Sequence, residues 1–113
     1  MIKTVKKPWG YEEWLVLNDK YCVKKLYITS GEKLSLQYHE QKTETMFLEE
    51  GICDLVLVGR VRCMKKGTPY TIHPKEVHRL VAHTDTVILE VSTPEVEDVV
   101  RLADNYDRAE KKG

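Results

Sequence analysis

The sequence has little of what marks a membrane, secreted or nucleic-acid-binding protein. It has no net charge, because 18 Lys and Arg balance 18 Asp and Glu, so it lacks the basic surface that nucleic acids and anionic membranes usually require. It has no long apolar run, which argues against a bilayer-spanning helix. Its N-terminus, MIKTVKKPWG, lacks the apolar core of a signal peptide. We therefore expect a soluble, cytoplasmic protein.

Cysteine is also scarce. The three cysteines, Cys22, Cys53 and Cys63, lie far apart and form no Cys-x-x-Cys pair. An odd, dispersed set argues against a disulfide framework and fits a reducing compartment. We expect all three to act as small apolar residues in strands.

The chain reads as one all-β domain. Its 113 residues suit a single domain, 1–113, with no internal repeat or low-complexity tract. Short strand-like segments separated by turn residues predict a barrel or sandwich. The predicted strands are 11–17, 21–28, 33–39, 43–49, 52–58, 60–65, 70–73, 78–82 and 86–91.

A short helix is predicted near the C-terminus. Thr93-Pro94 looks like an N-cap followed by proline at the first helical position. Acidic residues crowd the first turn, where the helix dipole favours them. The apolar residues then follow a helical spacing at Val96, Val99, Val100 and Ala103.

A group of polar residues with regular spacing lies between Gly31 and Gly51. It reads Gly31, five residues, Gln37, one residue, His39, four residues, Glu44, six residues, Gly51. This spacing resembles the first cupin motif, G-x5-H-x-H-x3-4-E-x6-G, with glutamine at the first histidine. Two ligands two apart on one strand share a face, and a carboxylate on the next strand can converge with them. Imidazole nitrogen with Gln and Glu oxygens suits zinc, manganese, iron or nickel.

The second half of the metal site is expected in Tyr70–Leu80, which resembles the second cupin motif and contains His78. The resemblance implies a cupin double-stranded β-helix, or jelly roll, with one divalent ion held by Gln37, His39, Glu44 and His78. Zinc is the first expectation, with manganese, iron, cobalt or nickel as alternatives. The family usually has a Pro-x-Gly turn before this histidine, whereas this chain has Pro74-Lys75-Glu76.

Three further segments resemble the type II mannose-6-phosphate isomerase domains, cupins that also occur fused behind GDP-mannose pyrophosphorylases. KPWGYEEW at 7–14 resembles their RPWG-x-Y-E opening. VKKL at 23–26 and GEKLSLQYH at 31–39 resemble VKRL and PGERLSLQMH, and 97–108 resembles the closing EDDIVRFDDRYGR. The resemblance spans about residues 6–108, and that family's Gln/His/Glu/His set accounts for Gln37. Where the family often has HHHRAEHW, this chain has HEQKTETM at 39–46, so an arginine is replaced by Lys42.

This resemblance implies metal-dependent isomerisation of mannose 6-phosphate to fructose 6-phosphate through an enediolate. A divalent metal would stabilise the developing oxyanion, and a general acid/base must reach both reacting carbons. Glu90 shares a strand face with Ser92 and is the expected catalytic base. The alternative is that Glu90 is a structural partner of a lysine or arginine in the cavity.

The phosphate is expected to bind cationic side chains near the metal. Arg79 is the first choice and a second catalytic candidate, because the family's His-Arg-Leu is intact at 78–80 and guanidinium matches phosphate geometry. Strand alternation, however, would point Arg79 away from the metal unless the strand bulges. Lys42, Lys33 and Ser35 are the other predicted substrate-binding residues, and Lys25 lies on a neighbouring strand.

Two other functions remain open. A non-catalytic metal- or sugar-binding cupin module would have the same fold and ligands. A cupin oxygenase would use iron at the same four positions, although Gln37 and Glu44 argue against dioxygen chemistry. Because a cupin keeps its polar face inside, the outer apolar strand faces need a partner surface, which favours a homodimer.

Overall fold

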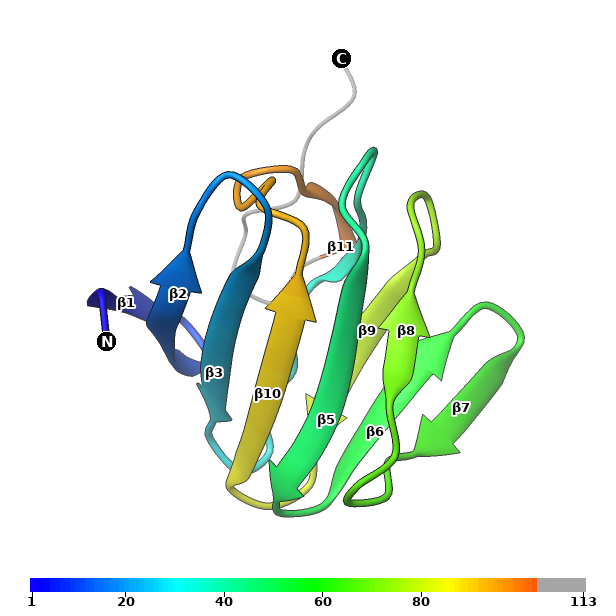
Figure 1. Ribbon diagram of the computed structural model, residues 1–113. Coiled ribbons are helices and arrows are strands. Elements are labelled where there is room, and N and C mark those ends of the chain that lie inside the picture. The colour runs from blue at the N-terminus through cyan, green and yellow to red at the C-terminus, as the bar shows by residue number, and fades with distance from the viewer. Residues whose placement is uncertain (104–113) are drawn as a thin grey trace.

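The structure is a computed structural model and describes residues 1–103. Two antiparallel sheets lie face to face (Figure 1). The first has the order β1 (Lys3–Lys7), β2 (Gly10–Leu17), β3 (Cys22–Ile28), β10 (Thr86–Ser92), β5 (Glu44–Glu50), β8 (Tyr70–Ile72). The second has the order β11 (Val100–Ala103), β4 (Leu36–Tyr38), β9 (His78–Ala82), β6 (Cys53–Leu57), β7 (Arg60–Cys63).

The predicted all-β architecture is confirmed, and every predicted strand has a counterpart. The predicted strand 33–39 is reduced to β4, with an isolated bridge between Lys33 and Val81 before it. The first and last strands, β1 and β11, were not predicted. No helix long and apolar enough to cross a membrane occurs in the described part of the chain.

The predicted C-terminal helix is wrong, since residues 1–103 contain no helix. After Pro94 the chain makes tight turns and then pairs with β4, placing Val100 opposite Tyr38 and Arg101 opposite Gln37. The edge of β4 offers backbone partners to a valine-rich segment, and this tertiary pairing overrides a weak helical signal. We call residues 93–103 the C-terminal strap.

The interior is polar at one end and apolar at the other. Inward positions alternate along each strand, so a polar residue such as Glu44 is followed two residues later by Met46 and then Leu48. The turn after β5 needs Gly51, whose φ is +93° and whose absent Cβ would overlap the Asp85 carbonyl. The apolar core consists of Trp9, Leu26, Ile28, Leu34, Met46, Leu48, Cys53, Leu55, Met64, Tyr70, Ile72, Leu80, Ala82 and Ile88.

Candidate metal centre

A cavity of about 110 Å³ occupies the polar end of the barrel. It is bordered by both sheets and by the C-terminal strap, which contributes Val96, Val99 and Arg101. All four predicted metal ligands line it: Gln37, His39, Glu44 and His78. The strap that was expected to lie on the barrel as a helix therefore forms part of the cavity wall.

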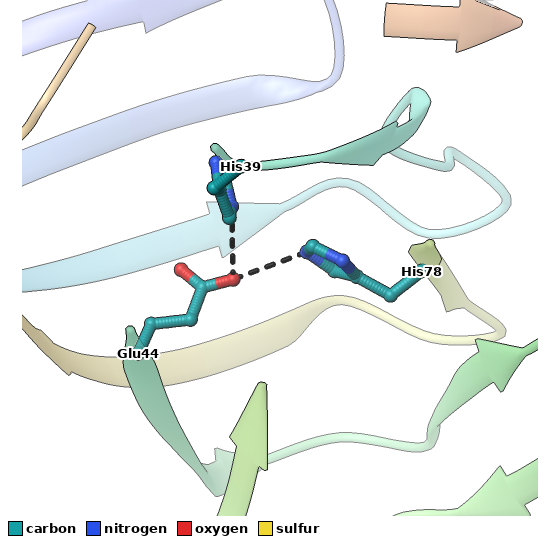
Figure 2. A group of neighbouring side chains, drawn as sticks. All are labelled: His39, Glu44 and His78. Atoms are coloured by element: carbon teal, nitrogen blue, oxygen red, sulfur yellow. Dashed lines mark hydrogen bonds and ion pairs between the residues drawn. The ribbon is translucent and has the colours of Figure 1, made fainter. Parts of the chain in front are cut away.

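Two imidazoles and one carboxylate converge in this cavity (Figure 2). His39 Nε2 lies 3.3 Å and His78 Nε2 lies 3.1 Å from the same oxygen, Glu44 Oε1. All three residues are buried, and one ligand atom from each lies within 4.8 Å of the others. His39 directly follows β4, whereas Glu44 begins β5 and His78 begins β9, so both sheets contribute. This cluster could hold a metal ion.

Backbone hydrogen bonds orient both histidines. His39 Nδ1 lies 2.5 Å from the Asp98 carbonyl, and His78 Nδ1 lies 2.9 Å from the Glu76 carbonyl. A carbonyl can only accept, so each Nδ1 carries the proton and each Nε2 is left for a ligand. Metal-binding histidines are usually held in this way. Two Nε2 lone pairs facing one carboxylate oxygen repel it unless a cation or proton lies between them, so the donor set fits a divalent metal.

Gln37 lines the same cavity as the triad. It is paired with His78 across β4 and β9, and its side-chain amide donates to Ser35 Oγ at 3.1 Å. This leaves its carbonyl oxygen as the group that would complete the ligand set. The prediction that Gln37 is the fourth ligand stays a prediction.

Lys42 and Glu90 lie directly behind the three clustered side chains. Lys42 Nζ lies 3.2 Å from Glu44 Oε2 and 3.2 Å from Glu90 Oε2, so the ammonium bridges two carboxylates. Lys42 and Glu90 are only 5% and 6% exposed. Such a network is costly to desolvate and is held by its mutual pairing.

These contacts shift several pKa values. Burial alone would raise the pKa of Glu44, but the hydrogen bonds that His39 and His78 donate to it when their Nε2 atoms are also protonated, together with the charge of Lys42, hold that pKa well below its usual range. Burial and the neighbouring Glu44 charge raise the pKa of Glu90 to about 7, against the opposing effect of Lys42. A carboxyl with such a pKa can both accept and donate a proton near neutrality.

The other predicted substrate residues are placed less favourably. Arg79 alternates away from His78 on a strand that pairs regularly with β6, and its guanidinium donates to the Leu34 and Ala103 carbonyls at 2.7 and 3.3 Å. It borders the cavity while holding the strap to the barrel. Lys33 is not among the described residues that line the cavity, whereas Ser35 is, and is 1% exposed.

Several other candidates are on the surface. His73 is exposed, and His83 pairs with Asp54 at 2.7 Å on the surface. Lys25 points outward and pairs with Glu49 at 3.3 Å. The three cysteines form no disulfide.

Sequence reasoning missed Lys24, Glu12 and Asp98. Lys24 and Glu12 lie on inward positions of β3 and β2 and line the cavity; alternation with Leu26 on β3 was the signal that could have identified Lys24. The Asp98 carboxylate accepts three backbone N–H groups, from Glu40, Gln41 and Lys42, at 2.7–3.0 Å. No local pattern predicts that long-range contact.

The turn before His78 keeps its shape without glycine. Lys75 has a φ of 68°, the left-handed conformation that glycine adopts most easily. Its N–H donates to the His39 carbonyl at 2.6 Å. The turn thereby links the segments that carry the two histidines.

Solved structures define the class of fold. The chain superposes on KdgF from Halomonas sp. with a TM-score of 0.75 at 15% identity, covering 82% of this chain and 86% of that one. An RmlC-like cupin from Shewanella frigidimarina gives a TM-score of 0.74 at 16% identity, with 84% and 86% covered. The protein thus has the RmlC-like cupin fold, a jelly roll, as predicted.

The sequence comparisons identify the family within that class. The family described as "Mannose-6-phosphate isomerase C-terminal" matches residues 1–104, so the chain belongs to this family. Mannose-1-phosphate guanylyltransferase of Escherichia coli (strain K12) is 29% identical over 111 residues, 94% of this chain and 23% of that protein. ManC of Salmonella typhimurium, with the same description, is 28% identical over 113 residues, 96% and 24%. The chain spans about a quarter of the length of these relatives.

Proposed function

We propose that this protein is a metal-dependent sugar-phosphate isomerase that interconverts mannose 6-phosphate and fructose 6-phosphate through an enediolate. Family membership motivates the substrate. The observation that carries the chemistry is the placement of Glu90, with its pKa raised to about 7, in the same cavity as the His39/Glu44/His78 cluster.

Each residue has a distinct role in the proposal. His39, Glu44, His78 and Gln37 would hold one divalent ion, zinc first, and that ion would supply Lewis-acid stabilisation of oxyanion charge on the open-chain sugar. Glu90 removes the proton from C2 of the aldose and returns it to C1 while the hydroxyl proton on O2 passes to O1, so the carbonyl moves from C1 to C2. Lys42 bridges Glu90 and Glu44 through its two 3.2 Å contacts, and its positive charge offsets the repulsion between the two carboxylates.

A coupled assay tests this proposal. Metal-stripped protein is given zinc, manganese, cobalt, nickel or iron in turn, and fructose 6-phosphate is measured after mannose 6-phosphate is added. We expect turnover only when a divalent ion is present. His39→Ala should lose both metal binding and turnover. Glu90→Gln should lose turnover but still bind the metal. His83→Ala, at a surface histidine, is the matched control and should keep full activity.

The second candidate is a non-catalytic metal- or sugar-binding module. It is favoured by the relatives, which are described as guanylyltransferases and of which this chain matches about a quarter. Metal binding without turnover in the same assay would favour this module and contradict the isomerase.

The dispersed, unpaired cysteines support a cytoplasmic location.

We also retain the homodimer as a proposal. The outward positions of β10 are apolar, namely Val87, Leu89 and Val91, the last 38% exposed. A partner surface would remove them from water. Sedimentation equilibrium would measure the mass, with twice the chain mass expected and a monomer at all concentrations contradicting it.

A further inference from the structure

A row of alternating charges crosses the inner face of the six-stranded sheet beyond the metal centre. Lys42 touches Glu44 and Glu90, and Glu90 is directly opposite Lys24 in the pairing of β10 with β3. Lys24 Nζ in turn lies 3.5 Å from Glu12 Oε1. All five side chains are buried: Glu12, Lys24, Glu90, Lys42 and Glu44.

At the end of this row away from the metal centre, Lys24 and Glu12 are held in place by several contacts. Lys24 is 5% exposed, and its ammonium lies 4.3 Å from the centroid of the Trp14 ring. Trp14 Nε1 donates to the same Glu12 oxygen at 2.9 Å, which fixes that carboxylate. An ammonium has three donors, and the Glu12 contact is long. By contrast, Lys42 is held by two carboxylates at 3.2 Å.

The charge of the cavity favours an anionic ligand. Among the described residues that line it, five are cationic and three are carboxylates, an excess of two positive charges before any metal is added. A divalent ion at the triad would increase that excess. A cavity lined mainly by one sign of charge attracts ligands of the opposite sign, so a ligand with its own negative charge suits the cavity.

The position of Lys24 fits the length of an open-chain sugar phosphate. Its strand β3 is two strands away from β5, which carries Glu44, and adjacent strands lie about 4.8 Å apart. Strands β3 and β5 are therefore roughly 10 Å apart. This distance is comparable to the length of an extended six-carbon chain with a terminal phosphate. Among the cations predicted for this role, Arg79 donates to two carbonyls and Lys33 is not among the cavity-lining residues described.

We propose that Lys24, oriented by Glu12 and Trp14, binds the terminal phosphate of an open-chain sugar phosphate whose other end reaches the metal. The inference rests on the proposed function for its ligand class, and it assigns the phosphate to a residue outside the metal motif. Glu90 lies on β10, between β3 and β5, and shares Lys42 with Glu44, so it lies beside the metal-bound end of the chain, where C1 and C2 would be.

The test uses a ligand that cannot be isomerised, so it does not depend on turnover. Titration calorimetry on the zinc-loaded chain compares mannitol 6-phosphate with mannitol. We expect the phosphate ester to bind at least tenfold tighter. Lys24→Met should remove that preference while leaving the zinc Kd unchanged. Lys25→Met is the matched control, because the neighbouring lysine points outward to Glu49, and it should keep the preference.

Two results would overturn the inference: no preference for the phosphate ester in the unaltered protein, or a preference retained in Lys24→Met. Should Lys24→Met fail to fold, the double variant Glu12→Gln/Lys24→Met removes the unpaired carboxylate and is measured instead. NMR of the unaltered protein is independent of all variants, because mannitol 6-phosphate should shift the Lys24 side-chain signals and spare those of Lys25. Unchanged Lys24 signals at saturation would also overturn it. A catalytically inactive protein that still shows the preference would separate this inference from the isomerase proposal.

Discussion

The two ends of the barrel interior are built by the same strands with opposite chemistry. On β5 the inward residues change from Glu44 to Met46, and on β10 from Glu90 to Ile88. The charged end forms the cavity, whereas the apolar end is close-packed. Burying apolar side chains stabilises the fold, while burying a charge network contributes little or costs stability. The difference fits the proposal that the charged end binds a ligand and contributes little to the stability of the fold.

The charged end should be the most sensitive to removal of one partner. Lys42→Met leaves Glu44 and Glu90 buried without their shared cation, so we expect a loss of about 3–5 kcal/mol in the free energy of unfolding. Urea denaturation measures it. Lys25→Met, which breaks a partly exposed pair, should cost at most about 1 kcal/mol. Equal losses in the two variants would contradict the distinction.

The apolar end should affect stability alone. Ile88 is fully buried, and Ile88→Ala should cost about 2–5 kcal/mol through lost burial and a cavity. Its metal Kd, measured by competition with a chelating dye below the unfolding transition, should stay within twofold of the original. A tenfold weaker metal Kd in this variant would show that the two ends are coupled.

The strap should affect the metal centre more than the fold. Asp98→Ala removes the three side-chain hydrogen bonds that hold the strap against the loop after His39, so the Asp98 carbonyl no longer fixes His39 Nδ1 in place. Loss of such outer contacts weakens metal binding about 10–100-fold, which the same chelator competition measures. The neighbouring exposed Glu97 supplies the control, Glu97→Ala, with an unchanged metal Kd. An unchanged metal Kd in Asp98→Ala would contradict this role of the strap.

The smallest effect is expected in the turn before His78. Lys75 has a left-handed φ of 68°, which costs a side-chain-bearing residue about 1–2 kcal/mol. Glycine avoids that cost but loses more conformational entropy, about 0.5–1 kcal/mol. Lys75→Gly should therefore raise the free energy of unfolding by about 0.5–1 kcal/mol in urea denaturation. A clear loss of stability would mean that the lysine side chain stabilises the turn.

Local patterns were sufficient for the strands and for much of the site. Two-residue spacing placed Gln37 and His39 on one face, and the cupin spacing brought in Glu44 and His78, which the structure gathers in one cavity. Alternation also indicated that Glu90 points inward and that Arg79 points away from His78. These features depend on periodicity, which a single sequence carries.

Contacts between distant segments could not be predicted in this way. The strap carries a helical spacing of valines, yet its conformation is set by pairing with the edge of β4 and by contacts with the loop after His39. Lys24 shares a strand face with Leu26 and Lys25 does not, but only the assembled sheets show that this face lines a cavity with a candidate metal site. Tertiary partners of this kind override local propensity.

The most direct test of the account is to locate the metal in crystals of the zinc-loaded protein by anomalous scattering at the zinc edge. The account predicts one strong peak bound by His39 Nε2, His78 Nε2 and a Glu44 oxygen, at about 2.0–2.2 Å from each. The Gln37 side-chain oxygen should face the same peak. A peak only elsewhere, for instance at the surface pair of His83 and Asp54, or no peak at all, would contradict the metal centre on which the proposed function depends.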